Sequence, residues 1–232
     1  MNKPTIAIIG AHAMDAELMG GAVASDLINK GWSAYLIHLT RGERGNKNKS
    51  AEEFGKQLEA ELKNSASKLK TKYIWPGYKA GNIPEEECAD YINQAINELK
   101  IDVIITHWKG SYHPRHVQTN RCVVEAVKRN LSEVKFHHVK CIFFGENMED
   151  MESFVPTCYY DITNTYDTWL QALNSYELFR EPNDRFPYKN YYESNSIVRG
   201  IEGGVKYAKA LMMYPSLMNN LLLPVSLCNP HY

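Results

Sequence analysis

Three histidines and an aspartate stand out in this chain because they occur as two pairs with a three-residue spacing. His12 and Asp15 form one pair within GAHAMDAELMGG, and His113 and His116 form the other within HPRH. Two imidazoles and one carboxylate leave coordination positions open on a metal ion, as in catalytic zinc and non-haem iron sites. Such an ion can lower the pKa of a bound water to about 7 and polarise a carbonyl. The residue types are therefore those of a hydrolytic metal centre.

Each pair taken alone also has an ordinary structural explanation. Asp15 is a suitable N-cap for a following helix, and two histidines at the start of a helix are often simply solvated. Pro114 favours a helix start, which places His113 at the cap and His116 in the first turn, roughly on the same face. The two pairs become informative only if the fold brings them to one place.

The surrounding sequence alternates between strand and helix patterns. Continuous apolar runs at residues 5–10, 34–40 and 102–107 are typical of strands covered on both faces. Further strands are expected near residues 73–75, 139–144 and 158–162, and helices at residues 16–30, 51–69, 84–99, 114–130 and 164–180. Repeated units of this kind predict an α/β fold: a single Rossmann-like domain over residues 1–232, with a mostly parallel sheet and helices on both faces.

This architecture predicts where a site would lie. Open α/β sheets bind their ligands outside the carboxyl ends of the strands. The polar residues that follow the three main strands are His12, Asp15, Thr40, Glu43, His107, His113 and His116. We therefore expect His12, Asp15 and His116 to converge on one divalent ion, with zinc as the natural choice for these ligands.

Composition limits the partners and the compartment. With 26 basic and 27 acidic residues the net charge is -1, so no overall field favours nucleic acid or anionic lipid. No apolar run has the length of a membrane span, and no signal-peptide pattern precedes the first strand. Five widely spaced cysteines without a CxxC pair indicate buried thiols in a reducing compartment. We expect a cytoplasmic protein that binds a small molecule, with no nucleic-acid or membrane partner.

Two further segments bear on assembly. Residues 186–192 (FPYKNYY) are expected to form an exposed aromatic loop, either a substrate platform or, with slight preference, a subunit contact. The apolar tail at residues 214–232 is too short to span a membrane and is expected to pack on the body or on a neighbouring subunit. Both segments are compatible with a homo-oligomer. The glycines near residue 20 do not form GxGxxG, so nicotinamide-cofactor binding is a weak alternative.

Residues 10–45 resemble the opening of the PIG-L/LmbE-like deacetylases, whose signature runs from AHPDD through a glycine-rich helix to TxGExG. HPRH resembles the second signature of that family, HPDH, and residues 156–163 and 204–208 are similar to its late DIT and GVxYAE segments. The resemblance spans nearly the whole chain in order. It implies a Rossmann-like α/β domain that holds a divalent metal, usually zinc. The activity it implies is removal of an N-acetyl group from an amino sugar or its conjugate.

Matched position by position, the resemblance implies a role for each motif residue. His12, Asp15 and His116 correspond to the metal ligands of the family. His113 corresponds to the histidine that stabilises charge on the carbonyl oxygen, and Glu43 to a glutamate near the sugar. Arg115 replaces the aspartate of HPDH and puts a positive charge beside the site, where we expect it to contact the substrate.

One departure concerns catalysis directly. The first aspartate of AHPDD is the general base of the family, and Met14 at this position cannot accept a proton. Losing a general base typically costs about 10²–10⁴-fold in rate. Glu17 is a poor substitute because i,i+2 positions on a helix face differently; Glu43 and His107 remain open, and His113 is the favoured substitute.

Two function classes follow. The first is a metal-dependent hydrolase of an N-acylated amino sugar or glycoconjugate with an altered proton-transfer arrangement, and retention of all three presumptive ligands favours it. The second is a catalytically silent relative that keeps the metal or sugar pocket for binding. Met14 and Arg115 favour that alternative.

Overall fold

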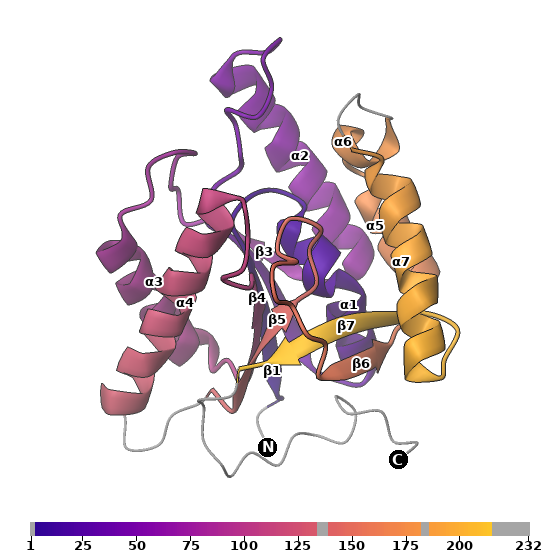
Figure 1. The fold of residues 1–232 in the computed structure, drawn as a ribbon. Helices are drawn as coiled ribbons and strands as arrows, with labels where there is room; N and C mark the ends of the chain where they lie inside the picture. The colour runs from indigo at the N-terminus through magenta and orange to yellow at the C-terminus, as the bar shows by residue number, and fades with distance from the viewer. Residues whose placement is uncertain (1–2, 134–138, 182–185, 215–232) are drawn as a thin grey trace.

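The computed structural model describes residues 3–133, 139–181 and 186–214, and a seven-stranded sheet forms its centre (Figure 1). The strands are β1 (Thr5–Gly10), β2 (Ser33–His38), β3 (Lys72–Ile74), β4 (Val103–Thr106), β5 (Cys141–Gly145), β6 (Cys158–Asp161) and β7 (Ala208–Met213), in the spatial order β3-β2-β1-β4-β5-β7-β6. Strands β1 to β5 pair in parallel, whereas β7 is antiparallel to both β5 and β6. The predicted α/β class and mostly parallel sheet are confirmed.

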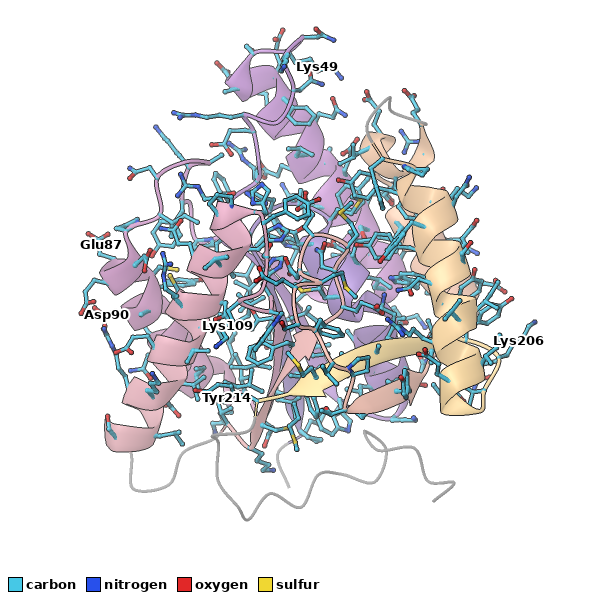
Figure 2. All side chains as sticks on the ribbon, viewed as in Figure 1. Lys49, Glu87, Asp90, Lys109, Lys206 and Tyr214 are labelled. Carbon is cyan, nitrogen blue, oxygen red and sulfur yellow. The ribbon has the colours of Figure 1, made fainter. Side chains whose placement is uncertain are left out.

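Helices cover both faces of this sheet. One face carries α3 (Glu85–Leu99) and α4 (Pro114–Glu133), and the other carries α1 (Ala22–Asn29), α2 (Ala51–Leu69), α5 (Tyr166–Leu173) and α7 (Tyr188–Gly203) (Figure 1). Side chains of β1 alternate between two apolar cores, with Ile6 and Ile8 in one and Ala7 and Ile9 in the other. Charged side chains lie outside these layers, such as Glu87 and Asp90 on the outer face of α3 (Figure 2). The alternation explains why the strands read as continuous apolar runs.

The chain leaves β1 through a site loop at residues 11–16 and a π-helical turn, η1 (Glu17–Gly21). Gly20 lets this turn approach the sheet, because a Cβ there would lie only 3.0 Å from Ile8 Cγ1 and 3.1 Å from Ile105 Cδ1. The indole of Trp169 donates a hydrogen bond of 2.8 Å to the carbonyl of Glu17. The loop that carries the first sequence pair is thus fixed between the sheet and a tight turn, a feature frequent near functional sites.

The aromatic segment at residues 186–192 is the clearest correction to the sequence analysis. It is not an exposed loop, since α7 begins at Tyr188 and Tyr192 is fully buried. The hydroxyl of Tyr192 accepts a hydrogen bond from the Met148 N–H at 3.1 Å. The same hydroxyl donates to Asn147 Oδ1 at 3.4 Å, so Tyr192 belongs to the core with its phenol fully hydrogen-bonded.

Two other elements also differ from expectation. The helix expected at residues 164–180 is divided into α5 and a single-turn helix, α6 (Glu177–Arg180). Strand β7 was not predicted, and it contains Lys209, which is 1% exposed with its ammonium 4.8 Å from the Trp169 ring. A lysine inside a strand is normally placed at the surface by pattern reasoning, because burying an ammonium is costly.

Cys88, Cys122 and Cys141 are buried, in agreement with the sequence analysis, and Cys158 is partly exposed. The apolar tail at residues 215–232 and Cys228 within it lie outside the described residues. No helix in the described part of the chain combines the length and apolar character needed to cross a membrane.

Candidate metal centre

The residues predicted from the strand ends gather at one edge of the sheet. The carboxylate oxygen Oδ2 of Asp15 accepts a hydrogen bond from the His12 N–H at 2.8 Å. The same oxygen lies 3.3 Å from His12 Nδ1 and 3.5 Å from His116 Nε2. His113 completes the group, with its ring centroid 5.0 Å from that of His12 and 4.5 Å from that of His116.

The second histidine pair takes its geometry from the start of α4. The helix begins at Pro114, and the His116 N–H donates to the His113 carbonyl at 3.1 Å. His116 is 1% exposed, whereas His113 is partly exposed. The HPRH motif therefore turns both rings toward the loop that follows β1, as expected from proline at the first helical position.

A buried carboxylate orients the histidines from behind. Asp150 follows β5 and is fully buried. Its Oδ1 pairs with His116 Nδ1 at 2.8 Å and its Oδ2 with His107 Nδ1 at 2.6 Å. His107 Nε2 accepts the Ala11 N–H at 3.1 Å, so His107 must donate to Asp150 through Nδ1. The bond to Asp150 likewise leaves His116 Nε2 directed toward Asp15, as in the carboxylate–histidine pairs of zinc sites.

These donors fit a divalent ion such as zinc. Imidazole nitrogen and carboxylate oxygen are the usual zinc ligands. Two groups have donor atoms within 4.8 Å of one another: His12, His113 and His116, and Asp15, His107 and His116. Because His107 engages both of its ring nitrogens, it is suited to positioning rather than to metal binding. His12, Asp15 and His116 instead face a common cavity.

Pairing with opposite charges outweighs burial for His116 and Asp150, whereas burial leads for His113. Burial disfavours a charged His116, but the carboxylates of Asp15 and Asp150 raise its pKa to about 10. Burial also disfavours a charged Asp150, but His107 and His116 lower its pKa to about 2. For His113, burial and the neighbouring charge of His116 act together and lower its pKa to about 4. His113 is therefore neutral at pH 7.

The neutral His113 ring has a defined role in hydrogen bonding. Its Nδ1 accepts the backbone N–H of Arg115 at 3.3 Å. The proton of the neutral ring must then lie on Nε2, an assignment that follows from this hydrogen bond. His113 is consequently arranged as a donor toward the cavity that it lines.

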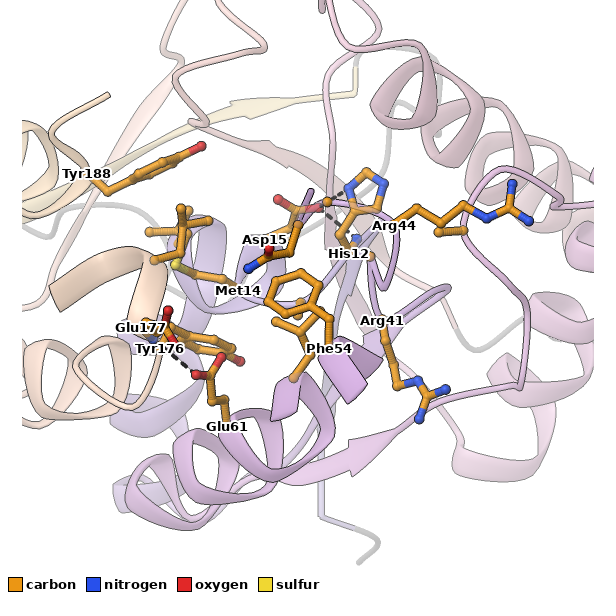
Figure 3. Close-up of a pocket in the computed structure, with 18 of the residues that line it drawn as sticks. His12, Met14, Asp15, Arg41, Arg44, Phe54, Glu61, Tyr176, Glu177 and Tyr188 are labelled. Atoms are coloured by element: carbon orange, nitrogen blue, oxygen red, sulfur yellow. Dashed lines mark hydrogen bonds and ion pairs between the residues drawn. The ribbon is translucent and has the colours of Figure 1, made fainter. Parts of the chain in front are cut away.

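A cavity of about 620 Å³ opens beside the cluster (Figure 3). Its apolar lining consists mainly of Met14, Leu18, Phe54, Leu58, Tyr176, Leu178 and Tyr188, and its polar lining includes Arg41, Arg44, Gln57, Glu61, Glu177 and Glu181. In Figure 3 the Met14 side chain lies between Tyr188 and Tyr176, on the side of Asp15 opposite His12. The size and mixed lining are typical of a small-molecule site.

Met14 stands at the cavity in an unusual backbone conformation. Its φ of 79° is in the left-handed region, which favours glycine, asparagine and aspartate, and the side chain is 4% exposed. A nearby carboxylate faces the same cavity: Glu149 Oε2 lies 3.4 Å from His116 Nε2. Burial raises the pKa of Glu149, so this carboxyl holds a proton more readily than an exposed glutamate does.

Sequence reasoning missed Glu149 and Asp150. A signal for them existed, because both follow the strand that was expected at residues 139–144. The same rule that selected His12 and His116, the carboxyl ends of parallel strands, also selects these two acids.

Glu43 and Arg115 lie slightly apart from the cluster, and neither side chain lines the cavity directly. Glu43 is buried, and its Oε1 accepts the Ala80 N–H at 2.8 Å, while its Oε2 has no hydrogen-bond partner among the described residues. Arg115 donates to Gln118 Oε1 at 2.8 Å and to the Gly81 carbonyl at 3.1 Å. Both side chains therefore contact the turn at residues 79–82 at the rim.

Comparison with protein families gives one match. The family model described as PIG-L, GlcNAc-PI de-N-acetylase, matches residues 7–127, which is more than half of the chain. This range includes both histidine motifs and Glu43. No curated protein sequence matches the chain.

Solved structures share the fold at low sequence identity. GalB, the 4-carboxy-2-hydroxymuconate hydratase of Pseudomonas putida KT2440, is 16% identical over 94% of this chain and 99% of that one, with a TM-score of 0.81. The N,N'-diacetylchitobiose deacetylase of Pyrococcus horikoshii is 18% identical over 95% and 87%, with a TM-score of 0.78. The zinc-inhibited form of teicoplanin deacetylase Orf2 is 13% identical over 91% and 99%, with a TM-score of 0.68. These likenesses establish the architecture.

Proposed function

This chain belongs to the PIG-L family, and on that premise we propose that it is a metal-dependent hydrolase that removes an N-acyl group from an amino sugar or its conjugate. The observation that carries the proposal is the position of Asp15, whose Oδ2 faces both His12 and His116 at the wall of a cavity. These three residues would hold the ion. When bound, zinc would polarise the acyl carbonyl and activate water for attack.

The other residues of the site would move protons and stabilise charge. His113 would donate its Nε2 proton as a hydrogen bond to the acyl oxygen, where negative charge develops. Glu149 would accept a proton from the attacking water and pass it to the leaving nitrogen. The water oxygen bonds to the carbonyl carbon as the C–N bond breaks, which yields a carboxylic acid and a free amine. This arrangement supplies the proton acceptor that Met14 cannot provide.

The cavity supports a sugar-like substrate. The aromatic rings of Phe54, Tyr176 and Tyr188 offer apolar faces, while Gln57 and Glu61 offer hydrogen-bonding groups for hydroxyls. Glu43 would support the cavity wall, because its Oε1 accepts the N–H of Ala80, a residue that lines the cavity.

Met14 favours a second candidate, a catalytically silent protein that retains the metal and sugar pocket for binding. Its apolar side chain occupies the place from which a carboxylate would act, and it is 4% exposed. In this candidate the metal and the sugar bind, but no bond is broken.

The test combines metal analysis with an assay. We expect about one zinc ion per wild-type chain and none in a His12→Ala, His116→Ala double variant. Arg121→Ala, on the outer surface of α4, is the matched control and should retain the metal. Acyl release is measured on a panel of N-acetyl sugars, with an unsaturated carboxylic acid included because a hydratase shares the fold.

The outcomes separate the candidates. Hydrolysis of an N-acyl sugar that is lost with the metal supports the hydrolase. Zinc and sugar binding without any hydrolysis would establish the catalytically silent candidate instead. Addition of water to the unsaturated acid would identify a hydratase and contradict both candidates. An unchanged metal content in the His12→Ala, His116→Ala double variant would contradict the proposed metal centre.

A further inference from the structure

Arg44, Arg115 and Arg180 are the described arginines that form no ion pair with a carboxylate, and Arg44 and Arg115 lie in the site region. Arg41, Arg121, Arg129 and Arg199 each form an ion pair with a carboxylate, and Arg180 donates to two backbone carbonyls. Arg115 bonds only to uncharged groups, the Gln118 amide and the Gly81 carbonyl. Arg44 forms no ion pair within the described part of the chain. Two positive charges in the site region therefore lack neutralisation.

The two guanidinium groups lie over the same glycine. A Cβ placed on Gly81 would be 3.3 Å from Arg44 Nη1 and 4.0 Å from Arg115 Nη2. Gly81 has a φ of 89° and no side chain, so no side chain of its own stands between the two groups. Both groups lie within 4.0 Å of one point, so one carboxylate or phosphate there could contact both arginines.

Glu43, which contacts the same turn, does not neutralise this pair. Glu43 directs Oε1 to the Ala80 N–H at 2.8 Å and forms no ion pair with either arginine. Like charges held side by side repel each other, and a bound anion would remove that repulsion. The planar fork of arginine matches the oxygens of carboxylates and phosphates.

The pair also adjoins the proposed reaction centre. Arg115 directly precedes His116, and Arg44 lines the cavity. A Cβ on Gly42, two residues before Arg44, would lie 3.3 Å from His12 Cβ. In Figure 3 the Arg44 side chain extends past His12, away from Met14 and Tyr176. A substrate placed at His12 could thus reach the two arginines.

We propose that Arg44 and Arg115 form a subsite for an anionic group of the substrate, a phosphate or a carboxylate. The substrate class is then an N-acyl amino sugar that carries a negative charge, such as a sugar phosphate or a uronic acid. That the substrate also places an N-acyl group at the metal centre rests on the proposed function. Binding of an anion by the two arginines is independent of the proposed function.

Isothermal titration calorimetry tests the subsite on the wild-type protein and on Arg44→Gln, Arg115→Gln and the double variant. The ligands are N-acetylglucosamine, its 6-phosphate and the corresponding uronic acid, and Arg121→Gln is the control for general charge. We expect a charged sugar to bind at least about tenfold more tightly than the neutral one, since two charge-assisted contacts are added. The double variant should lose this preference and retain its affinity for the neutral sugar. High salt should weaken only the charged ligands.

Equal affinity for charged and neutral sugars, unchanged in the double variant, would overturn the subsite even if acyl hydrolysis is observed. Arginine-dependent binding of a charged sugar that is never hydrolysed would instead support the subsite and contradict the proposed function. A preference confined to the phosphate or to the uronic acid identifies the anionic group.

Discussion

Two clusters of histidine and buried carboxylate lie in the described part of the chain, and they differ in what their remaining ring nitrogens face. In the open cluster, Asp150 pairs with His107 and His116 at 2.6 and 2.8 Å, and His116 Nε2 stays directed toward Asp15 at the cavity. In the sealed cluster, Glu17 pairs with its two partners through both carboxylate oxygens.

Burial separates the carboxylate and the imidazole of the sealed cluster from ligands, although the ring of Tyr176 lines the cavity. Glu17 Oε2 pairs with His38 Nε2 at 2.9 Å, and Oε1 accepts the Tyr176 hydroxyl at 2.6 Å. Both Glu17 and His38 are 0% exposed. The cluster ties η1 to β2 and to the segment before α6. One ring nitrogen, His38 Nδ1, has no hydrogen-bond partner among the described residues, but it is buried and does not face the cavity. Similar residue types therefore serve the scaffold in one place and face a ligand cavity in the other, according to whether the remaining ring nitrogen is buried or faces the cavity.

The largest effect should come from breaking the sealed cluster. Glu17→Ala leaves His38 and the Tyr176 hydroxyl buried without their partner, which should lower the free energy of unfolding by about 3–5 kcal/mol. Urea denaturation followed by circular dichroism measures the loss. Glu52→Ala, which removes an exposed pair with Lys56, is the control and should have no measurable effect. Equal losses in the two variants would contradict a structural role for Glu17.

Lys209 extends the comparison to a buried charge with no carboxylate at ion-pair distance among the described residues. Burial lowers its pKa to about 8, with Glu146 opposing and Arg199 adding to the shift. An unfolded lysine titrates near a pKa of about 10.4, so between these values the unfolded state binds more protons. The free energy of unfolding should therefore rise with pH from about 8 to 10, on the order of 1–3 kcal/mol.

Urea titrations of wild type and Lys209→Met over this pH range check the sign. The methionine variant should show a flatter dependence, since the titrating group is removed. A wild-type stability that falls between pH 8 and 10 while the variant stays flat would show that Lys209 is more stable as a cation in the fold.

The next largest effect is expected at the open cluster, on turnover, when the proposed proton acceptor Glu149 is replaced. Glu149→Gln should lower turnover by about 10²-fold, the lower end of what a positioned base contributes. Met14→Asp alone should change turnover little, but in the Glu149→Gln background it should recover much of the loss. Glu152→Gln, an exposed residue of the same loop, is the control. Loss of activity in His113→Ala together with full activity in Glu149→Gln would move the base to His113.

The smallest effect should come from the residue that supports the ligands from behind. Asp150→Asn keeps the size of the side chain but removes the charge that orients His107 and His116. The affinity for zinc, measured by chelator competition, should fall about tenfold. Asp161→Asn, an exposed residue at the end of β6, should leave it unchanged. An unaltered affinity in Asp150→Asn would show that packing alone fixes the two rings.

The sequence was most informative where local chemistry and topology agree. The apolar runs predicted parallel strands, and a single rule about their carboxyl ends led to His12, Asp15 and His116. Helix α2 was predicted from its charged amphipathic pattern with the bounds found in the structure, where Ser50 and Glu53 form a capping box at its start. Here local hydrogen bonds and the amphipathic pattern specify the same element.

The sequence was least informative where tertiary contacts override pattern. Tyr192 reads as a surface aromatic until Met148 is seen to donate to its hydroxyl, and Lys209 reads as exposed until the rings of Trp169 and Tyr192 enclose it. The place of Asp150 after a predicted strand could have been read from the sequence, but its pairing with His107 and His116 could not, because the sequence does not show which partners a buried carboxylate meets.

The left-handed backbone at Met14 has a consequence for how this position tolerates change. A φ of 79° favours glycine, asparagine or aspartate, and holding another residue there costs on the order of 1 kcal/mol. The methionine side chain nevertheless forms part of the cavity lining beside Leu18. In a library of variants at residue 14, selection for stability and selection for ligand shape should therefore enrich different amino acids, and selection for stability should deplete β-branched residues.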